Sequence, residues 1–167
     1  MDRVMRMQKK ICKQLDNYGY KWELYEGSLI VAKRELSFRV KIFKSFDWRT
    51  YVLLLDYCFD NEAIKDANPD VLNRIVCKVN YDNVDVKFVQ FGECDFLCRF
   101  KSHIRRASDF VKVFEHGFAN IIETVDEFYE GAEVLKQDLK PANSIGFVRQ
   151  NANTKTVAAE QKDKEVK

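Results

Sequence analysis

The sequence predicts an α+β fold, in which an antiparallel β-sheet of about five strands is covered by helices and closed by a long C-terminal helix. Three observations support this prediction. Residues 107–139 form one long amphipathic pattern, residues 28–59 contain three strand-like segments, and residues 84–103 form a hairpin pattern. The expected order is helix, three strands, helix, two strands and long helix, which places helices on one face of an antiparallel sheet.

The longest pattern runs from Ala107 to Leu139, where large apolar residues recur at helical spacing. Its stripe contains Phe110, Phe114, Phe118, Ile121, Val125, Phe128 and Leu135. Ser108 is the expected N-cap, and Asp109 lies in the first turn, where the helix dipole favours an anion. The spacing also fits a coiled-coil heptad, but a stripe covering roughly 140° of arc suits docking on a sheet better than a narrow seam. We expect Gly117, at the flank of the stripe, to allow a close approach of backbone.

Two shorter helices are predicted. In residues 3–17, apolar residues recur every three or four positions, and Gly19 suits the left-handed residue that ends a helix. Asn68-Pro69-Asp70 is a compact helix start, with an N-cap, a proline at the first position and an acid in the first turn. We expect this second helix to end near Asn80.

Three strands are predicted between these helices. Ser28–Lys33 is a short apolar run, and Leu36–Lys44 alternates apolar and polar residues as a half-buried strand does. Arg49–Phe59 is largely apolar on both faces, as expected for a central strand, and Ser45–Trp48 forms the turn before it.

The register of the Val84–His103 hairpin follows from its two apolar sets. They share a face only if Phe88 lies opposite Cys98 and Val86 opposite Phe100, because a slip of one residue moves a strand's side chains to the other face. This pairing predicts an odd-length connection through Phe91–Asp95.

Length and charge limit the classes of protein that the sequence can represent. We expect one α+β domain over residues 1–140 and a flexible polar tail over residues 141–167. The net charge is +4 in residues 1–21, +3 in residues 140–167 and −5 in residues 22–139. A mildly acidic body disfavours nucleic acid as the partner, because a nucleic-acid backbone needs a concentrated basic face. No apolar run approaches the ~18 residues of a membrane span, so we expect a cytoplasmic protein with reduced cysteines and no membrane segment.

No constellation for catalysis, metal binding or cofactor binding is present in the sequence. The two histidines, His103 and His116, have no partners at a zinc-ligand spacing. Cys94 and Cys98 fall four residues apart on a predicted strand, which is too far for chelation at about 3.3 Å per residue. No glycine-rich phosphate loop occurs. We therefore predict no catalytic residues, no metal, no cofactor and no enzyme activity.

Two groups of residues are candidates for partner binding. Arg99, Lys101, Arg105 and Arg106 form a basic cluster. This cluster could contact an anionic partner, or it could pair with the acidic start of the long helix. The second group belongs to the apolar stripe and serves either packing or a partner surface; it contains Phe114, Phe118, Ile121, Val125 and Phe128.

The order of elements resembles the type III secretion chaperone-like fold and, within it, the bacterial sensory-transduction-regulator domains. The resemblance covers residues 3–138. It rests on the helix ending in Tyr18-Gly19-Tyr20, the strands through Leu36–Phe59, the Leu72–Asn80 helix (LNRIVCKVN), the Val84–Phe100 hairpin and the closing helix. It implies a small non-enzymatic protein, often a dimer, that binds other proteins or their extended segments.

Three functional hypotheses follow. The first is a chaperone-like or protein-interaction module, a homodimer in bacterial signalling or secretion whose protein partner adds to a strand edge or lies beside the long helix. The second is an enzyme or small-molecule-binding domain with an aromatic pocket between the sheet and the long helix. The third is a nucleic-acid binder that uses the basic ends of the chain.

Overall fold

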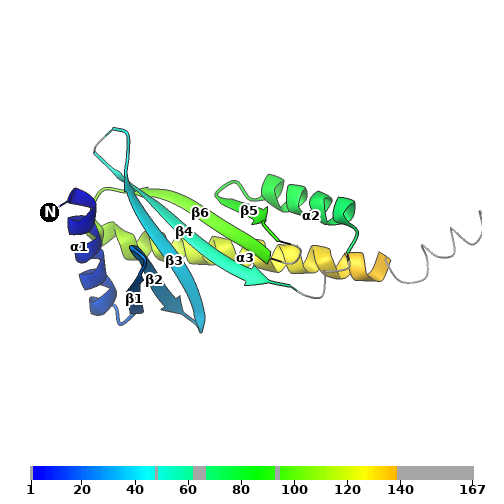
Figure 1. Cartoon of the computed structure of the whole chain (residues 1–167), viewed down its shortest axis with the longest axis horizontal. Coiled ribbons are helices and arrows are strands. Elements are labelled where there is room, and N and C mark those ends of the chain that lie inside the picture. The colour runs from blue at the N-terminus through cyan, green and yellow to red at the C-terminus, as the bar shows by residue number, and fades with distance from the viewer. Residues whose placement is uncertain (1, 48, 62–66, 93–94, 139–167) are drawn as a thin grey trace, which may run out of the picture. The chain divides into compact units, whose positions relative to one another are not determined.

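A computed structural model describes residues 2–47, 49–61, 67–92 and 95–138 of the 167-residue chain (Figure 1). The contacts of the chain group it into two units, Met1–Tyr129 and Glu130–Lys167, and the whole sheet lies in the first. The predicted tail over residues 141–167 lies outside the described residues, so the division into domain and tail stays a prediction. Within the described ranges, no helix is long and apolar enough to cross a membrane.

The fold is α+β, as predicted, and its sheet is antiparallel throughout. The helices are α1 (Arg3–Asn17), α2 (Pro69–Asp82) and α3 (Phe110–Asp138), with a short 3₁₀ turn, η2 (Ala107–Asp109), before α3. The strands are β1 (Lys21–Tyr25), β2 (Ser28–Lys33), β3 (Leu36–Lys44), β4 (Tyr51–Asp60), β5 (Val86–Gln90) and β6 (Asp95–Ile104). They are arranged in the order β1-β2-β3-β4-β6-β5.

The sheet contains six strands, one more than the sequence analysis predicted, because β1 was missed. Four of the five β1 side chains are exposed, so the strand lacks the apolar alternation by which the others were found. Its pairing with β2 is set by a two-residue turn, Glu26-Gly27, in which both residues have positive φ (47° and 73°). Such turns match the twist of an antiparallel hairpin.

The predicted start of the long helix was wrong in detail. Ser108 lies inside η2 and is not an N-cap; its hydroxyl donates to the Asp109 carboxylate. The cap position is Arg106, and its backbone N–H donates to the Asp109 carboxylate at 3.1 Å. An acid three residues after the cap therefore satisfies a backbone donor at the start of the turn.

Two further boundaries differ by two residues, each because of a side chain that bonds to the backbone. β4 begins at Tyr51 and not at Arg49, since the Asp47 carboxylate accepts the N–H groups of Arg49 and Thr50 and holds them in the turn. α2 continues past Asn80 to Asp82, where the Asn83 amide donates to the Val79 carbonyl at 2.9 Å.

The predicted register of the second hairpin is confirmed. Phe88 lies opposite Cys98, Val86 opposite Phe100 and Gln90 opposite Phe96. The connection is closed by the Phe91 N–H, which donates to the Asp95 carbonyl at 3.1 Å.

The core lies between one face of the sheet and α3, as the width of the apolar stripe predicted. The five stripe residues proposed for packing or partner binding are all buried: Phe114, Phe118, Ile121, Val125 and Phe128. Aromatic rings from the strands contact them. The Phe128 ring lies 4.6 Å from Phe88 and 4.7 Å from Phe96 between centroids, and Phe118 lies 5.4 Å from Phe38.

Gly117 allows α3 to approach β6 closely, as the sequence analysis expected. A Cβ atom added at Gly117 would lie 2.5 Å from Cδ1 and 2.9 Å from Cε1 of Phe100. Because Phe100 is itself buried, its ring has no free space into which to move.

We expect Gly117→Ala to destabilise the protein by up to about 2 kcal/mol, because overpacking costs about 1–3 kcal/mol and the gain in helix propensity returns about 1 kcal/mol. Chemical denaturation measures the change. In a Phe100→Leu background the ring is absent, so the same substitution should be neutral or stabilising. A Gly117→Ala protein more stable than the wild type would contradict the close approach.

Candidate interaction surface on the open face of the sheet

The two faces of the sheet have different environments. One face packs on α3, and the other carries strand side chains that the described helices leave at least partly exposed. In Figure 1, the sheet lies in front of α3, so this second face looks toward the viewer. We call it the open face.

Strand pairing brings five cations together on the open face. Arg39 on β3 lies opposite Asp56 on β4, which lies opposite Arg99 on β6, which in turn lies opposite Lys87 on β5. Two residues further along, which is the next position on the same face, Lys41 and Lys101 flank Leu54 from the two sides. We call these side chains the open-face basic cluster: Arg39, Lys41, Lys87, Arg99 and Lys101.

A buried carboxylate lies in the middle of this cluster. Asp56 is 4% exposed and accepts two hydrogen bonds from the Arg99 guanidinium, at 2.7 Å to Nε and 2.8 Å to Nη2. This hydrogen bonding raises the pKa of Arg99 above its ordinary value. The charge of Arg99, which the sequence analysis predicted as a contact for an anionic partner, is therefore balanced by Asp56. Lys41 and Lys101 lie next to this ion pair on the same face.

Removing one member of this ion pair should destabilise the protein more than removing both members. We expect Arg99→Leu to destabilise the protein by about 1–3 kcal/mol, because it leaves Asp56 buried without its bidentate partner. The double variant Asp56→Leu/Arg99→Leu should recover most of this loss, since apolar residues of similar size often replace a buried pair at little cost. Urea denaturation of the two variants tests the asymmetry, and additive losses in the double variant would contradict it.

Apolar side chains lie among the cations of the open face. Leu54 and Leu97 are half-buried, and Ile30 lies on the same face beside Arg39. Nearer the rim, Phe43 and Val89 are about half exposed. The open face therefore offers both cationic and apolar contacts.

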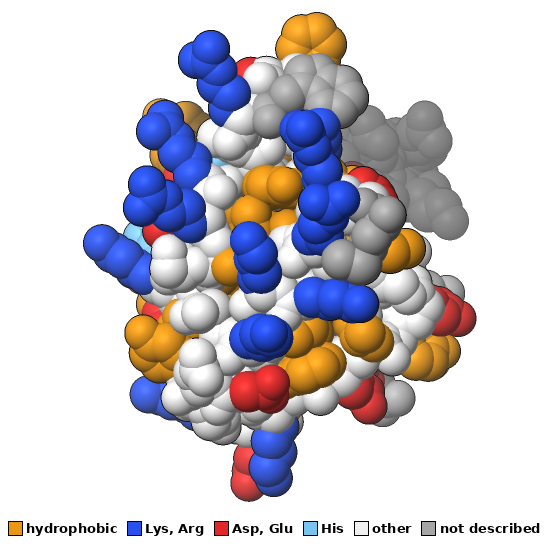
Figure 2. Space-filling model, turned by 90° about the vertical axis from the view of Figure 1, so that its left-hand side faces the viewer, with side chains coloured by type: hydrophobic (Ala, Val, Ile, Leu, Met, Phe, Trp, Pro, Cys, Tyr) orange, Lys and Arg blue, Asp and Glu red, His pale blue; other side chains and the backbone are white. Residues whose placement is uncertain are grey.

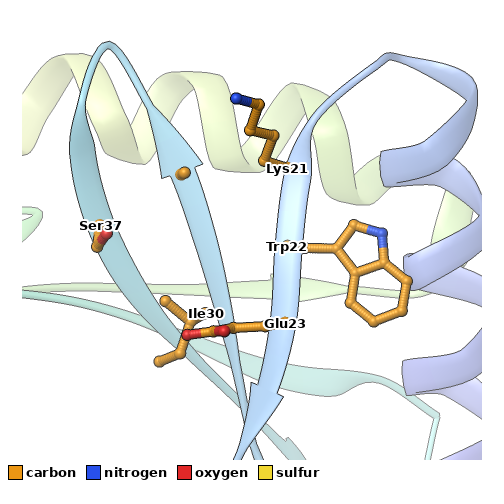
Figure 3. A pocket seen from close by; sticks show the side chains of 6 residues that line it. Lys21, Trp22, Glu23, Ile30 and Ser37 are labelled. Carbon is orange, nitrogen blue, oxygen red and sulfur yellow. The ribbon is translucent and has the colours of Figure 1, made fainter.

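A hollow of about 220 Å³ lies on the β1 side of this face (Figure 3). It is lined by Lys21, Trp22, Glu23, Ile30, Ala32 and Ser37. The Trp22 indole points away from the other side chains, and its Nε1 donates to the Asp16 carboxylate of α1 at 2.7 Å. Trp22 thus anchors β1 to α1, while Lys21 and Glu23 stay exposed on the strand.

The two edge strands of the sheet, β5 and β1, differ in whether their outer backbone groups are hydrogen-bonded. At β5, the Asn80 side chain of α2 donates to the Phe88 carbonyl at 2.7 Å and accepts the Phe88 N–H at 2.8 Å. These are the bonds that a neighbouring strand would make, so this edge is blocked to further pairing. Among the described strands, β1 pairs only with β2, so the opposite edge offers its outer side to an added strand.

The four residues of the predicted basic cluster do not occupy one place. Lys101 and Arg99 lie on the open face, whereas Arg105 and Arg106 are exposed in the segment that follows β6. The sequence analysis did not single out Arg39, Lys41 and Lys87. The alternation in Leu36–Lys44 already placed Arg39 and Lys41 on one side of β3, but their meeting with β6 depends on β4 lying between these strands.

Of the remaining candidate groups, His103 is exposed on the open face two residues after Lys101, whereas His116 and Cys98 do not belong to this face. His116 lies 4.0 Å from the Asp85 carboxylate, and within the described ranges no three potential ligands gather as a metal site. Cys98 is buried in the core, where desolvation raises the pKa of its thiol to about 12. A thiol with this pKa carries almost no thiolate at neutral pH and is a poor nucleophile.

Comparison with known proteins supports the fold. No family model matches the sequence, and no curated protein matches it. Among solved structures, the chain is similar to YbjN, described as "a putative transcription regulator from E. coli", with a TM-score of 0.50 and 12% sequence identity. The match covers 77% of this chain and 93% of the YbjN chain. At this identity, the likeness shows a YbjN-like fold.

Proposed function

We propose that the protein is a non-enzymatic regulatory or chaperone-like module that binds an acidic, partly apolar protein segment on the open face of its sheet. The observation that supports this most is the open-face basic cluster, whose five cations lie on four strands with apolar side chains such as Leu54 between or beside them. An extended segment matches this chemistry when both acidic and apolar residues fall on the side that faces the sheet, that is, at every second position, because successive side chains of a strand point to opposite sides.

Packing between the sheet and α3 favours this role over a small-molecule pocket at that place. Phe88, Phe96 and Phe128 are each almost completely buried, with ring centroids 4.6–5.4 Å apart. The space proposed for an aromatic pocket is therefore occupied by the protein's own rings.

The structural likeness to YbjN points in the same direction as the resemblance found in the sequence. YbjN is described as "a putative transcription regulator". The resemblance to sensory-transduction-regulator and type III secretion chaperone-like proteins implies binding to other proteins. This support is analogy at the level of the fold, to which the site adds its own chemistry.

Selection of peptides from a displayed library on the full-length chain tests the proposal. We expect enrichment of extended segments rich in Asp and Glu with interspersed apolar residues. Lys41→Glu/Lys101→Glu should weaken their binding at least tenfold, because two attractive charges become repulsive, and raising the salt concentration should weaken the wild-type interaction.

The matched control is Arg74→Glu/Lys112→Glu, which changes the net charge equally at exposed positions on α2 and α3. It should keep the affinity of the wild type. Peptides without acidic enrichment, or peptides that bind Lys41→Glu/Lys101→Glu as well as they bind the control, would contradict the proposed surface.

The open edge at β1 supports a second proposal, that the chain forms a homodimer by pairing two β1 strands. Leu24 and Tyr25 at this edge are 59% and 55% exposed. Tyr25 and Ser28 flank the two-residue turn and form a hydrogen-bonded pair of the β1–β2 ladder. Because hydrogen-bonded and non-hydrogen-bonded pairs alternate along such a ladder, the N–H of Leu24 points away from β2, to the outer side.

Leu24→Pro removes this outward N–H and should convert the dimer to a monomer without unfolding the sheet, since proline is tolerated on an edge strand. Light scattering measures the mass, and circular dichroism checks the fold. Leu24→Ala, which keeps the N–H, is the control and should stay dimeric. A wild-type chain with the mass of a monomer at all concentrations would exclude the dimer.

A further inference from the structure

A second basic surface lies at α1, where this helix meets the first residue of β4. A hollow of about 190 Å³ is lined there by Arg3, Arg6, Met7, Lys10 and Tyr51. Figure 2 views this end of the chain and shows Lys and Arg side chains gathered on it around apolar ones. We call this cavity the α1 hollow. It is a different site from the open face, which carries the proposed function.

The cations of α1 crowd like charges along one short helix. Between Asp2 and Asp16, the helix contains five Lys or Arg residues and no acid: Arg3, Arg6, Lys9, Lys10 and Lys13. Spacings of three and four residues place like charges side by side, which destabilises a helix by about 0.2–0.5 kcal/mol for each pair. Arg3 also lies in the first turn, where the helix dipole disfavours a cation.

The strand side of the hollow adds to this positive charge. Lys44 on β3 lies directly opposite Tyr51 in the ladder. Partial desolvation and the nearby Arg3 guanidinium both lower the pKa of Lys44, while Asp2, the acid that faces it, acts in the opposite direction. Lys44 thus lies next to Tyr51, one of the residues that line the hollow.

The side chains that line the hollow suit a phosphate group. An Arg guanidinium donates in a planar fork that matches two phosphate oxygens, and a Lys ammonium adds a compact charge. The hydroxyl of Tyr51 is a further donor. The volume is about six times the ~30 Å³ that one water molecule occupies in the liquid, so it has room for a phosphate group with bound water.

We propose that the α1 hollow binds the phosphate group of a phosphorylated ligand, held by Arg3, Arg6, Lys10 and Tyr51. The source is either a soluble phosphate compound or a lipid headgroup, which present the same group. A single-stranded nucleic acid fits less well, because its binding requires a basic groove that follows the backbone together with aromatic platforms. The hollow is a single open depression, and among the described residues that line it Tyr51 is the aromatic one.

Titration of the full-length chain tests the site with two probes, inorganic pyrophosphate and vesicles of phosphatidylcholine with or without phosphatidic acid. We expect binding that Arg6→Gln/Lys10→Gln weakens at least tenfold and Tyr51→Phe about threefold. Arg74→Gln/Lys112→Gln, which removes two exposed cations elsewhere, should leave the affinity unchanged. Binding of pyrophosphate in solution identifies a soluble ligand, and binding only to vesicles with phosphatidic acid identifies a headgroup; either result supports the site.

Thermal unfolding provides an independent readout that a misfolded variant could not mimic. Without ligand, Arg6→Gln/Lys10→Gln should still unfold in one cooperative transition, which shows that the variant is folded. Pyrophosphate should raise the Tm of the wild type but not that of this variant. The site is overturned if neither probe binds, if the control variant loses binding equally, or if only single-stranded DNA binds, with an affinity that grows with its length.

Discussion

The fold depends on the docking of the apolar stripe of α3 against one face of the sheet. Each large side chain buried there contributes roughly 1.5–3 kcal/mol, and the stripe residues that contact the sheet are nearly all buried. Gly117 sets the separation, since Phe100 occupies the space that a larger residue would need. Because one long helix covers one face, the other face remains available for the partner that we propose.

The distribution of charge follows from the same asymmetry. The segment 22–139 has a net charge of −5, from which we expected no concentrated basic face. Its acids lie partly on the outer side of α3, at positions such as Glu123 and Asp126, whereas alternate residues of four strands place cations on the open face. The net charge of the segment therefore averages over two surfaces, the acidic outer side of α3 and the basic open face. Only the arrangement of the strands shows that the two are distinct.

Local patterns predicted those parts of the structure that depend on neighbouring residues. The Phe88–Cys98 register and the docking of α3 follow from the phase of apolar residues along one hairpin and one helix. β1 escaped prediction because its side chains are mostly exposed. Ser108 was misassigned because the Asp109 carboxylate accepts the N–H of Arg106, so the helical turn begins two residues earlier, with Arg106 at the cap position. The open-face cluster required the pairing of Asp56 with Arg99, which are 43 residues apart, and no local pattern encodes such a pairing.

Asp56 explains how the cluster can persist without a partner. Arg39 and Arg99 lie on either side of it in the ladder, so its negative charge offsets repulsion between strands that would otherwise weaken the centre of the sheet. Since Asp56 is buried and Arg99 holds both of its oxygens, the carboxylate itself is not a contact for a partner. Lys41 and Lys101 extend beyond the pair on a rigid part of the sheet, and a binding surface whose backbone is already ordered loses less conformational entropy when a partner arrives.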